Sequence, residues 1–154
     1  KILKVNKKSS LKSAIDLGIA MQLTNISRDV IEDSKNNRFY INRDFREISS
    51  TINLADSFYQ NSFYSIKNIP ISFRFSILVA RRVYRKIGRK ILSKKNLENY
   101  QNSGKIYVSN IEKLLETFLS IFDLVRLSLT VKNEDRIQHD HVLINEEINL
   151  DERI

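Results

Sequence analysis

Residues 14–33 read AIDLGIAMQLTNISRDVIED, and this stretch decides how the chain folds. It contains no proline and one glycine, so its backbone is free to form a long helix. With about 100° of rotation per residue, apolar side chains occur on almost every side of that helix. A helix with this pattern is expected to be buried.

One face of this helix is polar in spite of its apolar surroundings. Gln22, Asn25, Asp29 and Asp33 fall within one sector of the helical wheel. Carboxylates one turn apart repel each other, and the negative end of a helix also disfavours them. A hard divalent cation reverses both penalties. The pattern therefore predicts a Mg²⁺ site at Asn25, Asp29 and Asp33, which Mn²⁺ could also occupy, and a phosphorylated substrate.

Basic side chains flank these carboxylates. Arg28, Lys35 and Arg38 are candidates for neutralising the phosphates of such a substrate. The alternative is a solvated helix end, in which Asp33 faces water and Arg28 pairs with Glu32 one turn further along. For an arbitrary Asp-x-x-x-Asp pattern, this alternative is the commoner one.

The composition of the chain indicates an all-α domain followed by an acidic tail. Of its 154 residues, 42% are hydrophobic, which is enough to bury the core of one domain. Residues 132–154 hold 3 basic and 7 acidic side chains, whereas the rest of the chain holds 23 and 11. We therefore predict a helical domain at residues 1–131 and a flexible acidic tail at residues 132–154. In that tail, His139 and His141 are expected to be solvated rather than bound to a metal.

Turn signals divide the helical part into segments. The first helix is expected to run from residue 11 to about 34, where Asn36-Asn37 ends it. A second helix is expected over residues 52–66, and a third over residues 72–92 after Pro70.

The last helix has the clearest signal. Ser109 and Glu112 form a capping-box pattern, and apolar residues follow at helical spacing. These residues are Ile111, Leu114, Leu115, Phe118, Leu119, Phe122, Val125 and Leu129.

Several classes of protein are excluded or disfavoured. The chain has no cysteine, which excludes disulfides, thiolate metal sites and cysteine nucleophiles. No apolar run approaches the roughly 18 residues of a membrane span, and no signal peptide opens the chain. We expect a cytoplasmic protein and leave peripheral membrane association open. Nucleic acid is disfavoured as a partner, because helix-turn-helix spacing and an exposed aromatic platform are absent.

The polar helix resembles the second aspartate-rich motif of the phytoene/squalene synthase family. The residues that carry the likeness are Leu17-Gly18-Ile19-Ala20-Met21-Gln22-Leu23-Thr24-Asn25-Ile26, Arg28-Asp29-Val30, Glu32-Asp33 and Arg38-Phe39-Tyr40. Looser similarity continues through Phe58-Tyr59, Ile69-Pro70 and Tyr84-Arg85, so the resemblance covers about residues 11–120. Arg38-Phe39-Tyr40 is closest to the Arg-x-Tyr of the bacterial phytoene synthase branch. The resemblance implies the C-terminal half of an isoprenoid synthase-type helical fold.

The family's reaction is a head-to-head condensation of two prenyl diphosphates. The resemblance implies conversion of geranylgeranyl diphosphate to phytoene through a cyclopropyl intermediate, as in carotenoid biosynthesis, or a squalene- or dehydrosqualene-type reaction of farnesyl diphosphate. It assigns Asp29 and Asp33 to catalysis through bound Mg²⁺. The candidate substrate-binding residues are Gln22, Arg28, Lys35, Arg38, Tyr40 and Tyr84.

The chain also departs from the family pattern. The family's first aspartate-rich motif lies far upstream of the second and is absent here, so a missing N-terminal half is expected to complete the site. The chain alone is expected to be inactive, and a truncated chain that serves only as a helical binding module is the alternative. Near Gly104-Lys105 the family often has an arginine, so one basic contact differs.

Overall fold

The computed structural model describes residues 8–130, and all of their regular structure is helical. The elements are α1 (Lys8–Lys35), α2 (Phe45–Ser62), the 3₁₀ helix η1 (Tyr64–Asn68), α3 (Ile71–Leu92), α4 (Leu97–Asn102) and α5 (Asn110–Leu129). The prediction of an all-α fold is confirmed for this part of the chain.

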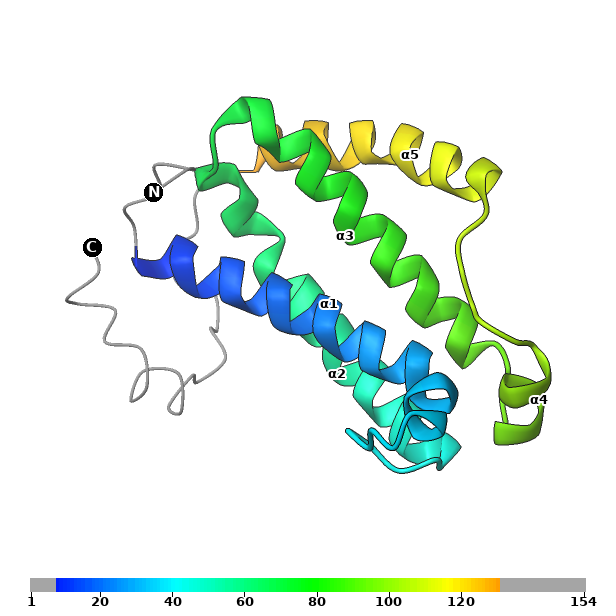
Figure 1. Ribbon diagram of the computed structural model, residues 1–154. Helices are drawn as coiled ribbons and strands as arrows, with labels where there is room; N and C mark the ends of the chain where they lie inside the picture. The colour runs from blue at the N-terminus through cyan, green and yellow to red at the C-terminus, as the bar shows by residue number, and fades with distance from the viewer. Residues whose placement is uncertain (1–7, 131–154) are drawn as a thin grey trace.

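The helices form an open arrangement with α3 at its centre (Figure 1). α1 and α2 pack along each other, and α3 contacts both of them. α5 lies along α3 on the side away from α1, and the short α4 sits beyond the C-terminal end of α3 (Figure 1). Among the described elements, α5 therefore contacts mainly α3 and η1.

The first helix ends where the sequence predicts. Asn37 has a φ of 56°, a left-handed conformation that asparagine tolerates better than most residues. The amides of Asn36 and Arg38 both donate to the carbonyl of Asp33, at 2.9 and 2.8 Å. The chain thereby turns back, and Arg38 comes to lie beside Asp33.

The other helices agree with the sequence except in three places. The second helix ends at Ser62 rather than at residue 66, and residues 64–68 form the 3₁₀ helix η1 instead. The second helix begins at Phe45 rather than at residue 52, because Asp44 caps it by accepting a hydrogen bond from the amide of Arg46. The capping box at Ser109 and Glu112 is confirmed, with both of its hydrogen bonds formed. α4, which Asn96 caps, is not predicted from the sequence.

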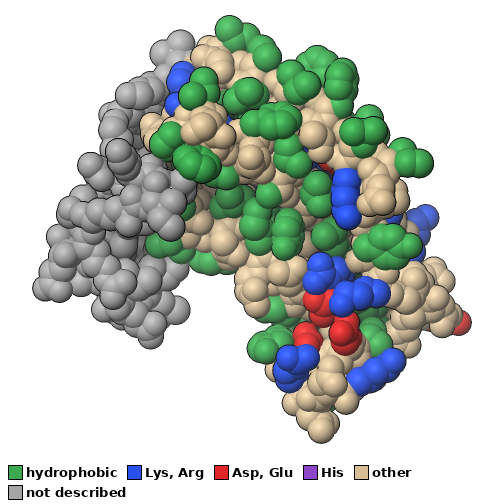
Figure 2. Space-filling view, turned by 45° about the horizontal axis from the view of Figure 1, so that its top comes forward, with side chains coloured by type: hydrophobic (Ala, Val, Ile, Leu, Met, Phe, Trp, Pro, Cys, Tyr) green, Lys and Arg blue, Asp and Glu red, His purple; other side chains and the backbone are tan. Residues whose placement is uncertain are grey.

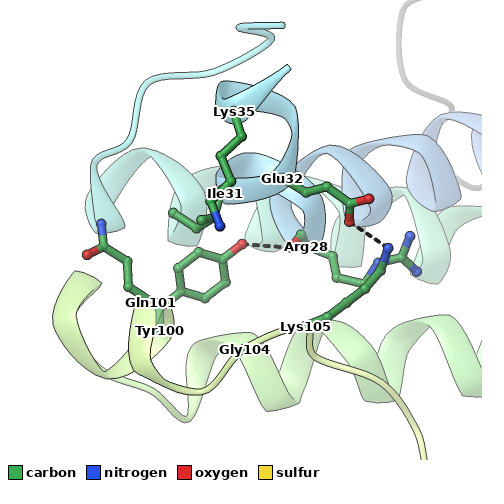
Figure 3. A pocket seen from close by; sticks show the side chains of 8 residues that line it. All are labelled: Arg28, Ile31, Glu32, Lys35, Tyr100, Gln101, Gly104 and Lys105. Carbon is green, nitrogen blue, oxygen red and sulfur yellow. Dashed lines mark hydrogen bonds and ion pairs between the residues drawn. The ribbon is translucent and has the colours of Figure 1, made fainter. Parts of the chain in front are cut away.

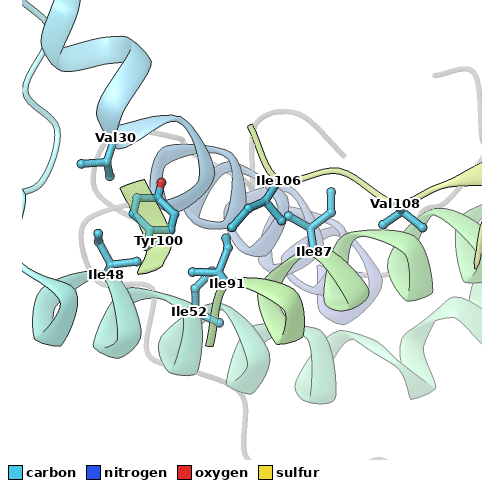
Figure 4. Packing of buried hydrophobic residues seen from close by; sticks show 8 residues of the cluster. All are labelled: Val30, Ile48, Ile52, Ile87, Ile91, Tyr100, Ile106 and Val108. Carbon is cyan, nitrogen blue, oxygen red and sulfur yellow. The ribbon is translucent and has the colours of Figure 1, made fainter. Parts of the chain in front are cut away.

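The largest core cluster joins α1, α2, α3 and the segment that includes α4 (Figure 4). Its buried members are Val30, Ile48, Ile52, Ile87, Ile91, Tyr100, Ile106 and Val108. This cluster fixes the C-terminal half of α1, and with it the predicted polar face, against the end of α3.

The whole of α1 is expected to be buried, but in the structure only one edge of the helix is. Its most buried residues are mainly small or polar, namely Ser13, Asp16, Ala20, Thr24, Ser27 and Val30. The larger apolar residues Leu17, Leu23 and Ile26 are only half-buried. Small side chains let α2 approach closely, and the Thr24 hydroxyl lies 3.1 Å from the Tyr59 hydroxyl at this contact. The apolar sides of α1 are thus only partly covered by the described residues.

Two sequence expectations concern membranes and the tail. Within residues 8–130, no helix combines the length and the hydrophobicity that a membrane span requires. The predicted tail at residues 132–154, with His139 and His141, lies outside the described residues.

The two helical glycines provide a test of this packing. A Cβ at Gly18 meets nothing within 4 Å, so we expect Gly18→Ala to raise the free energy of unfolding by about 0.5–1 kcal/mol. A Cβ at Gly88 lies 3.1 Å from Cγ2 of the buried, β-branched Ile52, which has little freedom to move. We expect Gly88→Ala to lower the free energy of unfolding by about 1 kcal/mol in urea denaturation. Equal stabilisation by both substitutions contradicts the contact between α2 and α3.

The capping box predicts a pH-dependent stability. The hydrogen bond from Lys90 and those at Ser109 lower the pKa of Glu112 to about 2 from its ordinary 4.5. A lowered folded-state pKa means that the stabilisation is present above pH 4.5 and is lost as the pH falls toward 2. We expect Glu112→Gln to lower the free energy of unfolding at pH 6. Near pH 2, the free energy of unfolding of this variant should approach that of the wild type. Glu98→Gln, at an exposed position, is the control. If the effect of Glu112→Gln on the free energy of unfolding does not change with pH, the prediction is contradicted.

Candidate functional site

The predicted polar face lies near the C-terminal end of α1. The side chains of Asp29 and Asp33 are only 20% and 16% exposed. Asn25 is half-buried, and its Oδ1 is buried and accepts no hydrogen bond from the described residues. Gln22, by contrast, is exposed. Three of the four predicted residues therefore hold their oxygen atoms partly out of water, at successive turns of one helix.

Two cations surround Asp29. The guanidinium of Arg28 donates from Nε to Oδ1 at 2.9 Å and from Nη2 to Oδ2 at 2.6 Å. Lys105 Nζ lies 3.7 Å from Asp29 Oδ1 and donates to Glu32 Oε2 at 2.7 Å. Partial burial works against the charge of Asp29, but the hydrogen bonds and charges of these cations outweigh it. They hold the pKa of the Asp29 carboxyl below its ordinary value.

The turn after α1 supplies a third cation. Arg38 Nη2 lies 3.2 Å from Asp33 Oδ1, and more than half of the Arg38 side chain is exposed. Tyr40 is 60% exposed and Lys35 is also exposed. Of these three residues from the end of the motif, only Arg38 contacts an acidic residue of the predicted site.

Tyr84 approaches the same helix from α3. It is half-buried and packs against the cluster of Ala20, Ala55 and Tyr59, where α1, α2 and α3 meet. Its position beside α1 agrees both with a role near the substrate and with plain packing.

A pocket of about 280 Å³ opens next to the acidic face (Figure 3). α1 lines it with Arg28, Ile31, Glu32 and Lys35. The opposite wall consists of Tyr100, Gln101, Gly104 and Lys105. Asp29 and Asp33 do not line this pocket, so it holds two of the predicted basic residues, Arg28 and Lys35, but none of the predicted metal ligands.

Two residues of this site come from far along the chain. The Tyr100 hydroxyl donates to the carbonyls of Ser27 and Arg28, each at 2.8 Å, and Figure 3 shows the bond to Arg28. Burial raises the pKa of Tyr100 to about 12. Tyr100 thus clamps α4 to the turn of α1 that carries Arg28 and Asp29. No local pattern marks Tyr100 in the sequence. Lys105 is marked only as the position at which the family often has an arginine.

The donor atoms fit one side of a magnesium site. Within residues 8–130, no group of three or more His, Cys, Asp or Glu side chains is gathered closely enough to hold a metal ion by itself. Two carboxylates one turn apart, together with the free Asn25 Oδ1, offer the few oxygen ligands through which Mg²⁺ is held alongside substrate phosphates. Any metal at Asp29 competes with Arg28 and Lys105 for the same oxygens.

Comparisons with known proteins agree with this motif. The squalene/phytoene synthase family model matches residues 1–47, which include the acidic face. The 15-cis-phytoene synthase of Enterobacter agglomerans is 30% identical over 112 residues, covering 59% of this chain and 38% of that protein. The phytoene synthase of Cereibacter sphaeroides is 31% identical over 112 residues, covering 58% and 32%. Among solved structures, none matches the chain significantly.

A plant relative extends the similarity along the chain. Phytoene synthase 2 of Solanum lycopersicum, a chloroplast protein, is 28% identical over 134 residues, covering 73% of this chain and 42% of the relative. The chain spans about a third of the length of the curated relatives it matches. The family model matches the acidic helix and the phytoene synthases are similar along most of the sequence, so both comparisons support the squalene/phytoene synthase family for this chain.

Proposed function

We propose that the chain forms part of a magnesium-dependent enzyme that condenses two prenyl diphosphates head to head, as a phytoene synthase does with geranylgeranyl diphosphate. The observation that carries this proposal is the line of oxygen donors at Asn25, Asp29 and Asp33, bordered by Arg28, Arg38 and Lys105. Carboxylates beside several cations are suited to a charged ligand that brings both a metal and phosphate groups. The phytoene synthase relatives support this choice of reaction.

The residues of this chain have separate roles in that reaction. Bound Mg²⁺ supplies positive charge that stabilises the departing diphosphate. Asp29 and Asp33 would hold the metal, and Asn25 would add a neutral oxygen. Arg28, Arg38 and Lys105 pair with these carboxylates and are placed to bind the phosphates of the substrate. Because the diphosphate leaves as an anion that the neighbouring cations stabilise, its departure requires no general acid.

The half-buried apolar residues of α1, together with Tyr84 of α3, form the apolar part of the proposed site. Leu23 and Ile26 flank the acidic face and are only partly covered by the described residues. We assign them to the wall that contacts the prenyl chains and keeps water from the carbocation. We expect the opposite wall, with its own carboxylates, to correspond to the part of the relatives' length that this chain does not span.

Substitution of the acidic face tests the reaction. In a polypeptide that also carries the rest of the relatives' length, we expect Asp29→Asn and Asp33→Asn each to lower the turnover of radiolabelled prenyl diphosphate at least 100-fold, because each removes a metal ligand. Glu32→Gln is a matched control, since Glu32 also pairs with Lys105 but is exposed. Geranylgeranyl and farnesyl diphosphate are compared as substrates to separate the phytoene and squalene types. Retained turnover in Asp29→Asn, or an equal loss in Glu32→Gln, counts against the assignment.

Metal binding is tested without catalysis. In the ¹⁵N-labelled chain, we expect substoichiometric Mn²⁺ to broaden the amide signals of Asn25, Asp29 and Asp33 first, because their oxygens face one side of α1. Asp56 on α2 serves as the internal control, because its carboxylate accepts hydrogen bonds of 2.7 and 2.9 Å from Arg85. The double substitution Asp29→Asn/Asp33→Asn should remove the selective broadening. Broadening that is uniform among exposed carboxylates contradicts a metal site here.

A further inference from the structure

The two cations that share the carboxylate of Asp29 are held with different firmness. Arg28, its neighbour in α1, donates two hydrogen bonds to it at 2.9 and 2.6 Å, and the Arg28 side chain is only 21% exposed. Lys105 comes from the segment after α4, and its side chain is 58% exposed. On the face of the molecule in Figure 2, acidic side chains gather in a cluster with basic side chains on several sides. The two cations are therefore not equivalent when a further cation approaches Asp29.

The contact between Lys105 and Asp29 is the weaker of the two. A carboxylate has about four lone-pair positions, and a bidentate guanidinium takes two of them, so Arg28 leaves room for a further ligand. The Lys105 ammonium lies 3.7 Å from Asp29 Oδ1, too far for a hydrogen bond, and it therefore acts on Asp29 through its charge alone.

A divalent cation on Asp29 would repel this ammonium. Mg²⁺ lies about 2.1 Å from a ligand oxygen, so an ion bonded to Oδ1 would stand within about 6 Å of the Lys105 nitrogen. That separation is shorter than the screening length of about 8 Å at physiological ionic strength, so salt removes only part of the repulsion.

Lys105 can leave Asp29 by rotation of its side chain. Its Nζ donates to Glu32 Oε2 at 2.7 Å, and both residues line the pocket beside α1 (Figure 3). The backbone around Lys105 is fixed, because Gly104 has a φ of 64° and Ile106 is buried in the core cluster. The flexible lysine side chain can thus keep its bond to Glu32 and turn into the pocket, without a change in the fold.

We propose that Lys105 is a built-in counter-ion of the acidic face, which neutralises Asp29 in the metal-free chain and which a divalent cation displaces toward Glu32 and the pocket. Lys105 then weakens metal binding, and occupation of the metal site changes the charge that lines the pocket. The inference rests on the proposed function, in which Asp29 holds the metal. The alternative is an exposed ion pair that only helps to hold the segment after α4, and such pairs have little effect.

The first test measures metal binding by the 154-residue chain without substrate. Free Mn²⁺ is quantified by electron paramagnetic resonance during a titration. We expect Lys105→Met to raise the affinity for Mn²⁺ roughly fivefold, because it removes an opposing charge a few ångströms from the metal. Lys35→Met is the matched control, since Lys35 is exposed, lines the same pocket and forms no ion pair with residues 8–130. It should change the affinity less than about twofold, because its charge is more fully screened.

A second measurement identifies the side chain that moves. Reductive methylation with ¹³C-formaldehyde labels the lysines and keeps their charge. The signal of Lys105, assigned by its absence in Lys105→Met, should shift as Mg²⁺ is added. The signal of Lys90, which pairs with Glu112 away from the acidic face, should not shift. In the ¹⁵N-labelled chain, the Nε–H signal of Arg28 should remain visible, because its hydrogen bond to Asp29 slows exchange with water.

Three results would overturn the proposal. They are an unchanged Mn²⁺ affinity in Lys105→Met, an equal gain in Lys35→Met, which would indicate net charge alone, and a Lys105 signal that does not respond to Mg²⁺. Each of them leaves the proposed function intact as long as the wild-type chain binds Mn²⁺. Absence of Mn²⁺ binding overturns both the metal site and this inference. Displacement of Lys105 without turnover in the longer polypeptide refutes only the proposed function.

Discussion

The carboxylate of Asp29 sits one turn before the last turn of α1, where the helix dipole is unfavourable to an anion and where partial burial adds to the cost. Its charge is tolerated because Arg28 and Lys105 approach it from two sides. Lys105 follows α4, which the two hydrogen bonds from Tyr100 hold against the backbone of α1, and the next residue, Ile106, is buried in the core cluster. This anchoring explains why a helix of only six residues matters to the acidic face.

A second electrostatic constraint sets the orientation of α5. An amphipathic helix in a free-standing domain turns its apolar side to the core. Here Arg82 sits between Glu116 and Asp123, and although burial works against its charge, these hydrogen bonds raise its pKa. Removing one partner of such a buried pair typically costs about 3–5 kcal/mol. That cost is comparable with burying two large apolar side chains, at about 1.5–3 kcal/mol each, so the ion pairs oppose a rotation of α5 but do not by themselves outweigh the burial of all its exposed apolar side chains.

Local signals predicted the elements, whereas contacts between distant residues decided how they pack. The Asn36-Asn37 turn, Pro70 and the capping box at Ser109 each act through neighbouring backbone groups, and the structure confirms all three. The wheel of α1 identified a polar face, but it did not reveal that small residues form the buried edge. That edge is set by the approach of α2. The clamp at Tyr100 and the pairing of Arg82 join residues 34 to 73 positions apart, and no periodicity within one helix encodes them.

The acidic face and the apolar side of α5 share a physical property, because the described residues cover each of them only in part. The oxygens of Asn25, Asp29 and Asp33 are neither fully solvated nor enclosed, and the apolar side of α5 is exposed over its whole length. A surface that closed over both would remove water from the oxygen donors and from the apolar helix at once.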